Sequence, residues 1–161
     1  MAAPRWLAFA TLGIGFIAAV FSPERRGLHD VVHLAGLRDD VPDLLRESDL
    51  MCLPSLSEGM PYALLEAAAI GLPMLASAVG GMAAVLTQDE TARLVAPANS
   101  VALADELRWF MGHRERALEL GRSAREMVRR RYGVERMIGE TLRLYEGRPA
   151  DRSVGAGGRH S

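Results

Sequence analysis

The stretch of residues 49–81 constrains the fold of this chain more than any other. Two short apolar runs, Leu50–Leu53 and Pro73–Ser77, flank an Ala- and Leu-rich segment that follows Pro61 and stops at Gly71. Short apolar runs closed by Pro, Ser or Gly are typical of buried parallel strands. Proline suits the start of a helix and glycine its end. The stretch therefore predicts a strand, a loop, a helix and a second strand.

Two acidic residues bracket the start of the expected helix. Glu58 would lie where the chain leaves the carboxyl end of a strand, the edge at which open α/β sheets bind ligands. Free N–H groups of Tyr62, Ala63 and Leu64 in the first helical turn would form a site for an anion such as phosphate. Glu66, farther along the helix, would reach hydroxyl groups of the same ligand. The alternative is two solvated acids on an ordinary crossover.

The run P-S-L-S-E-G-M-P-Y-A-L-L-E-A-A-A-I-G-L-P-M-L-A-S-A-V-G-G resembles the donor-binding signature of the group 1 family of retaining glycosyltransferases, in which seven residues separate two glutamates. The resemblance also covers the preceding residues 33–50 and the helices expected up to Glu146. It implies a Rossmann-like α/β domain, with a parallel sheet flanked by helices, like the C-terminal half of a GT-B glycosyltransferase. The implied reaction is transfer of a hexose from a nucleotide sugar to an acceptor hydroxyl.

The resemblance also implies roles for single residues. Glu58 would be catalytic, beside the hydroxyl groups or reacting face of the donor sugar, and Glu66 would hold the ribose hydroxyls. Leu37 and Arg38 would lie near the base, although Arg38 also suits a solvated loop. The backbone donors to sugar and phosphate would be Gly59, Met60, Tyr62, Ala63 and Leu64. We expect no metal and no other cofactor, because the chain has no Asp-x-Asp pair.

This sequence departs from the family pattern in several places. Ala83 and Ala84 stand where a proline and a glutamate usually follow the two glycines, and Thr91-Ala92 replaces a Thr-Gly pair. The family's N-terminal acceptor domain and its basic Arg and Lys pair have no counterpart in these 161 residues. We therefore expect a truncated, donor-binding half that is inactive alone and needs a separate acceptor-binding domain or chain. The alternative is a non-catalytic nucleotide-sugar-binding or interaction module.

Composition narrows the class of protein. The 161 residues, 49% of them hydrophobic, suffice for one domain with a sizeable core. A net charge of −1 gives no excess of cations for binding nucleic acid, so we expect small-molecule partners. The single cysteine, Cys52, lies in an apolar run, where a buried thiol is the ordinary role. A reducing compartment such as the cytoplasm suits this composition.

The N-terminal run, residues 6–21, is almost wholly apolar and leaves three interpretations open. It is close to the length of about 20 residues that spans a membrane, with Arg25-Arg26 as a cytoplasmic flank. It has the length of a signal peptide but lacks a small-x-small cleavage site before Ser22. The family resemblance favours a buried strand and helix. Attachment to the inner face of the membrane therefore remains an alternative to a freely cytoplasmic protein.

We expect three segments: the apolar residues 1–26, a nucleotide-sugar-binding domain at 27–147, and a disordered tail at 148–161. Asp40 is expected to cap a helix, and Val79-Gly80-Gly81 to form a flexible turn. The further expected strands are 30–36 and 93–95, and the further expected helices are 40–47, 82–86, 99–111, 114–131 and 134–146.

Overall fold

The computed structural model describes residues 5–10, 16–21, 32–36 and 38–147. Its strands form one six-stranded sheet in the order β3-β2-β1-β4-β5-β6. The strands are β1 (Arg5–Ala10), β2 (Phe16–Phe21), β3 (Val32–Gly36), β4 (Ser48–Leu53), β5 (Met74–Ser77) and β6 (Arg93–Val95). Strands β1, β4, β5 and β6 are paired in parallel, whereas β2 is antiparallel to both β1 and β3.

The expectation of a strand and a helix in residues 6–21 is half wrong. The described parts of this run are two antiparallel strands, β1 and β2, and β1 also pairs with β4. Between them the sequence T-L-G-I-G contains two glycines, which disfavour a continuous helix. Among the described residues, no helix has the length and apolar character needed to cross a lipid bilayer. The division of the chain at residues 26 and 147 stays a prediction.

The helices lie close to their expected positions. They are α2 (Val41–Glu47), α3 (Tyr62–Ile70), α4 (Gly80–Val85), α5 (Ser100–Gly112), α6 (Arg114–Tyr132) and α7 (Val134–Tyr145). Gly71 ends α3 in the left-handed conformation, with φ of 79°, as expected for a glycine at a helix C-terminus. The Asn99 side chain caps α5 by accepting a hydrogen bond from the Ala102 N–H at 3.0 Å. These local signals explain why both boundaries were predictable.

Alternating residues of β4 face two different clusters of buried side chains. Met51 and Leu53 belong to a cluster that includes residues of α2, α3, α4 and the second half of α6. Leu50 and Cys52 belong to a second cluster that includes Phe110 of α5. Because side chains alternate across a strand, the two clusters lie on opposite faces of the sheet. Strand β4 is therefore covered on both faces, and β5 is buried along its whole length, as predicted from their continuous apolar runs.

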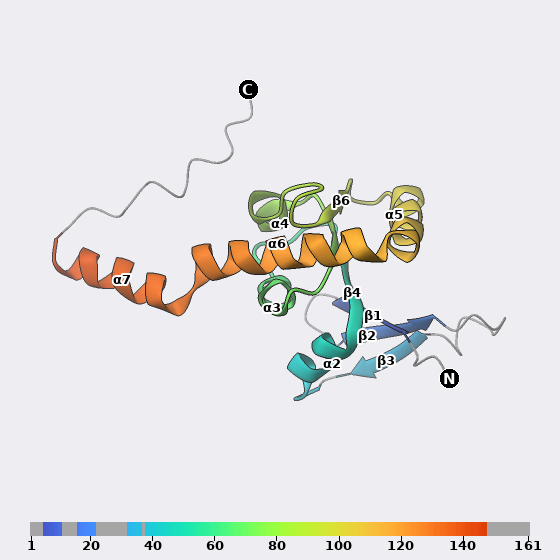
Figure 1. Cartoon of the computed structure of the whole chain (residues 1–161), viewed down its shortest axis with the longest axis horizontal. Helices are drawn as coiled ribbons and strands as arrows, with labels where there is room; N and C mark the ends of the chain where they lie inside the picture. Colours follow the sequence, from blue (N-terminus) through green and yellow to red (C-terminus); the bar gives the residue numbers. More distant parts are fainter. Residues whose placement is uncertain (1–4, 11–15, 22–31, 37, 148–161) are drawn as a thin grey trace, which may run out of the picture.

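Helix α6 crosses α3 (Figure 1), and Gly121 and Arg125 of α6 contact Gly71 at the C-terminal end of α3. A Cβ atom added to Gly121 would lie 2.2 Å from the carbonyl oxygen of Gly71, so the two helices can meet here only without that side chain. Helix α7 continues away from the sheet and has no buried residue. Its exposed apolar side chains are Val134, Met137, Ile138, Leu142, Leu144 and Tyr145.

Candidate functional site

The carboxyl ends of β4 and β5 place two connecting segments at one edge of the sheet. Leu53, the last residue of β4, is paired with Ala76, one residue before the end of β5. The chain then continues into residues 54–61 on one side and into α4 on the other. Loops that leave adjacent parallel strands at the same edge are where α/β sheets bind ligands. The candidate site is built from these two segments and the start of α3.

Glu58 and Glu66 both belong to this site but are held differently. Glu58 lies half-buried in the loop after β4, and the Ser55 hydroxyl donates a long hydrogen bond of 3.4 Å to Glu58 Oε2. Glu66 is exposed on α3, four residues after Tyr62, which is a rise of about 6 Å along a helix. The two carboxylates are therefore placed on the same strand-to-helix connection, as the sequence predicted.

The first turn of α3 offers fewer free N–H groups than expected. Pro61 precedes the helix and supplies no side-chain cap, and the hydrogen bonds of the described residues include no acceptor for the N–H groups of Tyr62 and Ala63. The N–H of Leu64, in contrast, donates to the Pro61 carbonyl at 3.1 Å, and the Leu64 side chain is fully buried. A tight first turn thus already gives the Leu64 N–H an acceptor within the chain, and donation by Leu64 to a ligand stays a prediction.

The other predicted contact residues near Glu58 are accessible to a ligand. Gly59 and Met60 are exposed, and the Tyr62 side chain is 80% exposed beside the helix start. The carbonyl oxygen of Gly59 is not free, because it accepts a hydrogen bond from the Gly81 N–H at 2.7 Å. Gly59 and Met60 thus keep their backbone N–H groups near the site while their main chain is held from the other side. Their roles as donors stay predictions.

Arg38 follows a strand that is not adjacent to β4, and its expected place near the base stays a prediction. It follows β3, which is separated from β4 by two strands, a distance of about 14 Å at the usual strand spacing. Its Nε donates to Asp40 Oδ1 at 2.7 Å, and this pairing raises the pKa of Arg38 and lowers the pKa of Asp40. The expected cap is wrong in detail, because Asp40 precedes α2 without accepting a capping hydrogen bond. Leu37 lies outside the described residues.

Two glycines that we expected to form a flexible turn are the first residues of α4. A Cβ atom on Gly80 would lie 1.8 Å from the Glu58 carbonyl oxygen, and one on Gly81 would lie 2.0 Å from the Gly59 carbonyl oxygen. The glycines are therefore needed for close contact with the Glu58 loop. In the sequence, the two adjacent glycines suggest a close backbone contact, but they do not indicate that the partner is the loop of Glu58 and Gly59.

Two further features bear on the chemistry of the site. The described residues contain no group of three or more His, Cys, Asp or Glu side chains arranged to hold a metal ion. Cys52 is the residue before the last one of β4, and burial raises the pKa of its thiol to about 12. A thiol of this kind stays protonated at neutral pH and is a poor nucleophile. Among the described residues, this edge of the sheet offers the two carboxylates, the hydroxyls of Ser55 and Tyr62, and backbone N–H groups.

Comparisons with known proteins identify relatives of the whole domain. The sequence profile described as glycosyl transferases group 1 matches residues 22–127. N-acetyl-alpha-D-glucosaminyl L-malate synthase from Bacillus anthracis is 31% identical over 118 residues, which are 73% of this chain and 31% of that protein. The Anabaena protein Alr3699/HepE in complex with UDP-glucose matches with a TM-score of 0.68 and 26% identity, over 74% of this chain and 34% of that one.

A third similar structure is that of a C-terminal domain alone. The C-terminal domain of the glycosyl transferase group 1 family protein LpcC from Francisella tularensis matches with a TM-score of 0.56 and 23% identity, over 61% of this chain and 50% of that one. These likenesses confirm the expected Rossmann-like α/β fold of GT-B glycosyltransferases. The chain spans about a third of the length of the Bacillus relative. Because the profile match covers more than half of the sequence, the chain belongs to the glycosyl transferases group 1 family.

Proposed function

We propose that this chain is the donor-binding half of a retaining glycosyltransferase that transfers a hexosyl group from a nucleoside diphosphate sugar to an acceptor hydroxyl. The observation that carries the proposal is the single connection from β4 to α3, which places Glu58, the free N–H groups of Tyr62 and Ala63, and Glu66 at one edge of the sheet. UDP-glucose in the Anabaena structure supports a donor of this class.

Each part of such a donor has a counterpart in the site. The N–H groups of Tyr62 and Ala63 and the dipole of α3 would stabilise the diphosphate. Glu66 would accept hydrogen bonds from the ribose hydroxyls, and Glu58 would face the sugar. In the reaction the bond between the anomeric carbon and the phosphate oxygen breaks, and the diphosphate leaves with the electron pair. The acceptor oxygen then bonds to the same face of that carbon, and its proton passes to an oxygen of the departing diphosphate.

Stabilisation of charge in the transition state is the main task of the protein in this proposal. The leaving diphosphate gains negative charge while the sugar gains oxocarbenium character, so fixed N–H dipoles near the one and a carboxylate near the other both lower the barrier. Such groups act most strongly where water is excluded. The α3 edge is open, because Glu66 and Tyr62 are exposed. We therefore infer that a second domain covers the donor during the reaction.

Helix α7 suits contact with that second, acceptor-binding part, whether it belongs to the same polypeptide or to a separate chain. Six large apolar side chains are exposed on this helix, and it has no buried residue. Exposed apolar patches of this kind mark contact surfaces. The Bacillus relative contains further polypeptide beyond the 31% that this chain matches. The proposal keeps a cytoplasmic location, free or at the inner face of the membrane, and no metal requirement.

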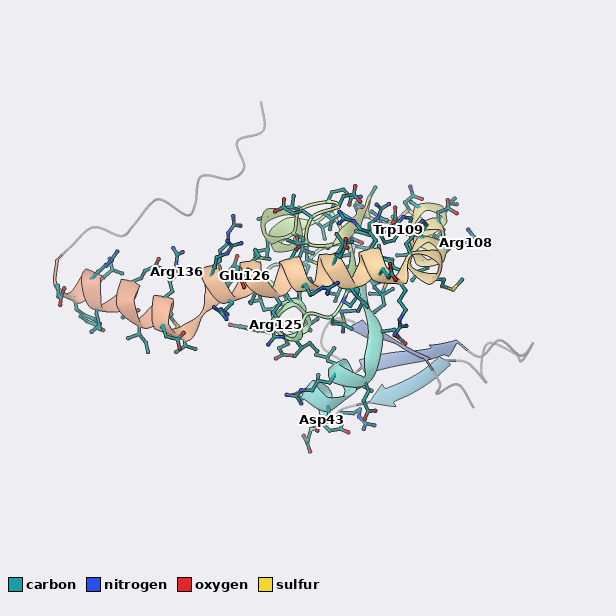
Figure 2. All side chains as sticks on the ribbon, viewed as in Figure 1. Asp43, Arg108, Trp109, Arg125, Glu126 and Arg136 are labelled. Atoms are coloured by element: carbon teal, nitrogen blue, oxygen red, sulfur yellow. The ribbon has the colours of Figure 1, made fainter. Side chains whose placement is uncertain are left out.

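Calorimetry with UDP, UDP-glucose and GDP-mannose tests the proposal. Glu66→Ala should weaken nucleotide binding by about 1–3 kcal/mol, roughly 5- to 150-fold in Kd, because hydrogen bonds from a charged group are lost. Glu58→Ala should weaken the sugar conjugate more than the free nucleotide. Glu126→Ala is the matched control. Glu126 is also an exposed glutamate on a helix, but it lies in α6 near the start of α7 and outside the candidate site (Figure 2).

Two results would count against the proposal. If the unmodified chain binds none of these nucleotides or nucleotide sugars, the chain is not a donor-binding domain for this class of ligand. If Glu58→Ala weakens UDP as much as UDP-glucose, Glu58 does not face the sugar. Binding that is unchanged by addition of EDTA is expected, and binding that disappears with EDTA would show that a metal ion takes part.

A further inference from the structure

We propose that Gly80 and Gly81 are positioning residues that set the place of Glu58 and of the Gly59 peptide for the donor sugar. The proposal rests on the function proposed above, and it assigns to the start of α4 a role that no local sequence pattern shows. Its basis is a backbone-to-backbone contact between two segments that are separated by about 20 residues in the sequence.

The contact leaves no room for a side chain. A Cβ atom at position 80 would lie 1.8 Å from the Glu58 carbonyl oxygen, and one at position 81 would lie 2.0 Å from the Gly59 carbonyl oxygen. In real structures, a Cβ atom essentially never lies within 3.0 Å of a heavy atom from another part of the chain. Any residue other than glycine would therefore push the two segments apart by about 1 Å. Gly80 also has φ of 48°, a conformation that L side chains rarely adopt.

The contact is directional as well as close. The Gly81 N–H donates to the Gly59 carbonyl oxygen at 2.7 Å, which is a short hydrogen bond between backbone groups. This bond fixes the orientation of the peptide that joins Gly59 to Met60. The same loop carries the Glu58 carboxylate, which the Ser55 hydroxyl contacts at 3.4 Å. Helix α4 thus contacts the loop through the main-chain carbonyl groups of Glu58 and Gly59, and this contact does not use the Glu58 carboxylate.

Helix α4 can act as a fixed support because it is anchored in the core. Met82 is fully buried and Val85 is 3% exposed, and both belong to the cluster that also contains the buried residues of α3. The two glycines directly precede Met82, so their backbone has little freedom to withdraw from the loop. A change at position 81 should therefore be absorbed by the Glu58 loop rather than by α4.

Gly81→Ala is the sharpest test, because the φ of Gly81 is not positive and the added methyl group acts through its volume alone. We expect UDP-glucose to bind at least about tenfold more weakly, the loss of roughly one charged hydrogen bond, while UDP binding changes by less than about twofold. In a complete two-domain enzyme, a displacement of about 1 Å should lower kcat by about 100-fold and should raise the KM for UDP-glucose together with its Kd.

Two matched glycine variants separate positioning from stability. Gly121→Ala places a Cβ atom 2.2 Å from the Gly71 carbonyl oxygen, between α3 and α6 and away from the Glu58 loop. It should lower the Tm without changing the ratio of the Kd values for UDP-glucose and UDP. Gly139→Ala has open space around the added Cβ atom and should change neither quantity. A changed Kd ratio in Gly121→Ala would mean that lost stability, rather than loop position, explains the result.

Amide hydrogen exchange on the unmodified chain tests the contact without any variant. The Gly81 N–H should exchange much more slowly than the N–H of Ser57, which is exposed in the same loop as Glu58. Fast exchange at Gly81, or a Gly81→Ala variant that binds UDP-glucose and UDP as the unmodified chain does, would overturn the positioning role. Failure of the proposed function looks different: no nucleotide binds, although Gly81 remains protected.

Discussion

The ion pair between Arg93 and Glu106 should stabilise the edge of the sheet far more than any surface pair in this domain. Arg93 of β6 donates from Nε and Nη2 to the two carboxylate oxygens of Glu106 on α5, at 2.6 and 2.7 Å. The side chains are only 18% and 19% exposed. The guanidinium also lies 4.5 Å from the centre of the Trp109 ring, and it contacts Asp89. Glu106 is the main cause of the raised pKa of Arg93.

Glu106→Ala removes both hydrogen bonds and leaves a half-buried cation. Each hydrogen bond to a charged group contributes about 1.5–3 kcal/mol to the free energy of unfolding. Arg93 keeps its contacts with Asp89 and Trp109 and can be reached by water. We therefore expect the variant to lose about 2 kcal/mol of that free energy. For a domain of this size the Tm should fall by about 4–8 °C. Urea unfolding at pH 7 would measure the free energy directly.

Asp105→Ala is the matched control, because Asp105 also belongs to α5 and pairs with an arginine, Arg108, at 2.6 Å. That pair is 70% and 66% exposed, so its loss should cost less than about 0.5 kcal/mol. Figure 2 shows Arg108 and Trp109 on α5. The reasoning is refuted if Asp105→Ala costs as much as Glu106→Ala. It is also refuted if a double-mutant cycle of Arg93 and Glu106 gives a coupling below about 0.5 kcal/mol.

Two further predictions concern the thiol and the activity. Because Cys52 is the single cysteine and is buried, a thiol reagent at pH 8 should label the chain no faster than it unfolds, and rapid labelling of the folded chain would contradict the burial. Its folded pKa of about 12 lies above the ordinary value of 9.0, so its contribution to stability is complete below pH 9 and is lost as the pH rises toward 12. The 161-residue polypeptide should bind a donor without transferring it, because one domain cannot supply the roughly 7–11 kcal/mol that positioning of both substrates provides. Turnover that Glu58→Ala abolishes would show that one domain suffices.

Local signals in the sequence predicted the elements between residues 48 and 146 well. Gly71 and Asn99 marked the end of α3 and the start of α5, because a left-handed glycine and a capping amide act within a few residues of the boundary. Residues 6–21 gave no comparable signal. The two glycines in this apolar run disfavour a continuous helix but do not by themselves indicate two strands, and the pairing of β1 with β4 and with β2 decided for strands.

The site was predictable where it depends on spacing and not where it depends on contacts between distant segments. The positions of Glu58 and Glu66 follow from the strand-to-helix connection itself. The bond from Leu64 to Pro61 depends on how tightly the first turn closes, and Asp40 turns to Arg38 instead of capping α2. In both cases a polar group has more than one possible hydrogen-bond partner, and the sequence does not show which partner it takes.

The two carboxylates of the site depend on different parts of the fold, and this explains which departures from the family pattern matter. The position of Glu66 is fixed by α3, whose residues Leu64 and Ala67 are buried in the core. The position of Glu58 is fixed by the contact of its loop with the first turn of α4. Ala83 and Ala84, where the family resemblance led us to expect a proline and a glutamate, are both exposed on α4. The contact behind Glu58 depends on the two glycines at the start of α4 and on the buried Met82 and Val85, and not on the exposed side chains at positions 83 and 84. The replaced glutamate could therefore act only by direct contact with a ligand, and restoring it with Ala84→Glu should change donor affinity without changing the exchange rate of the Gly81 N–H.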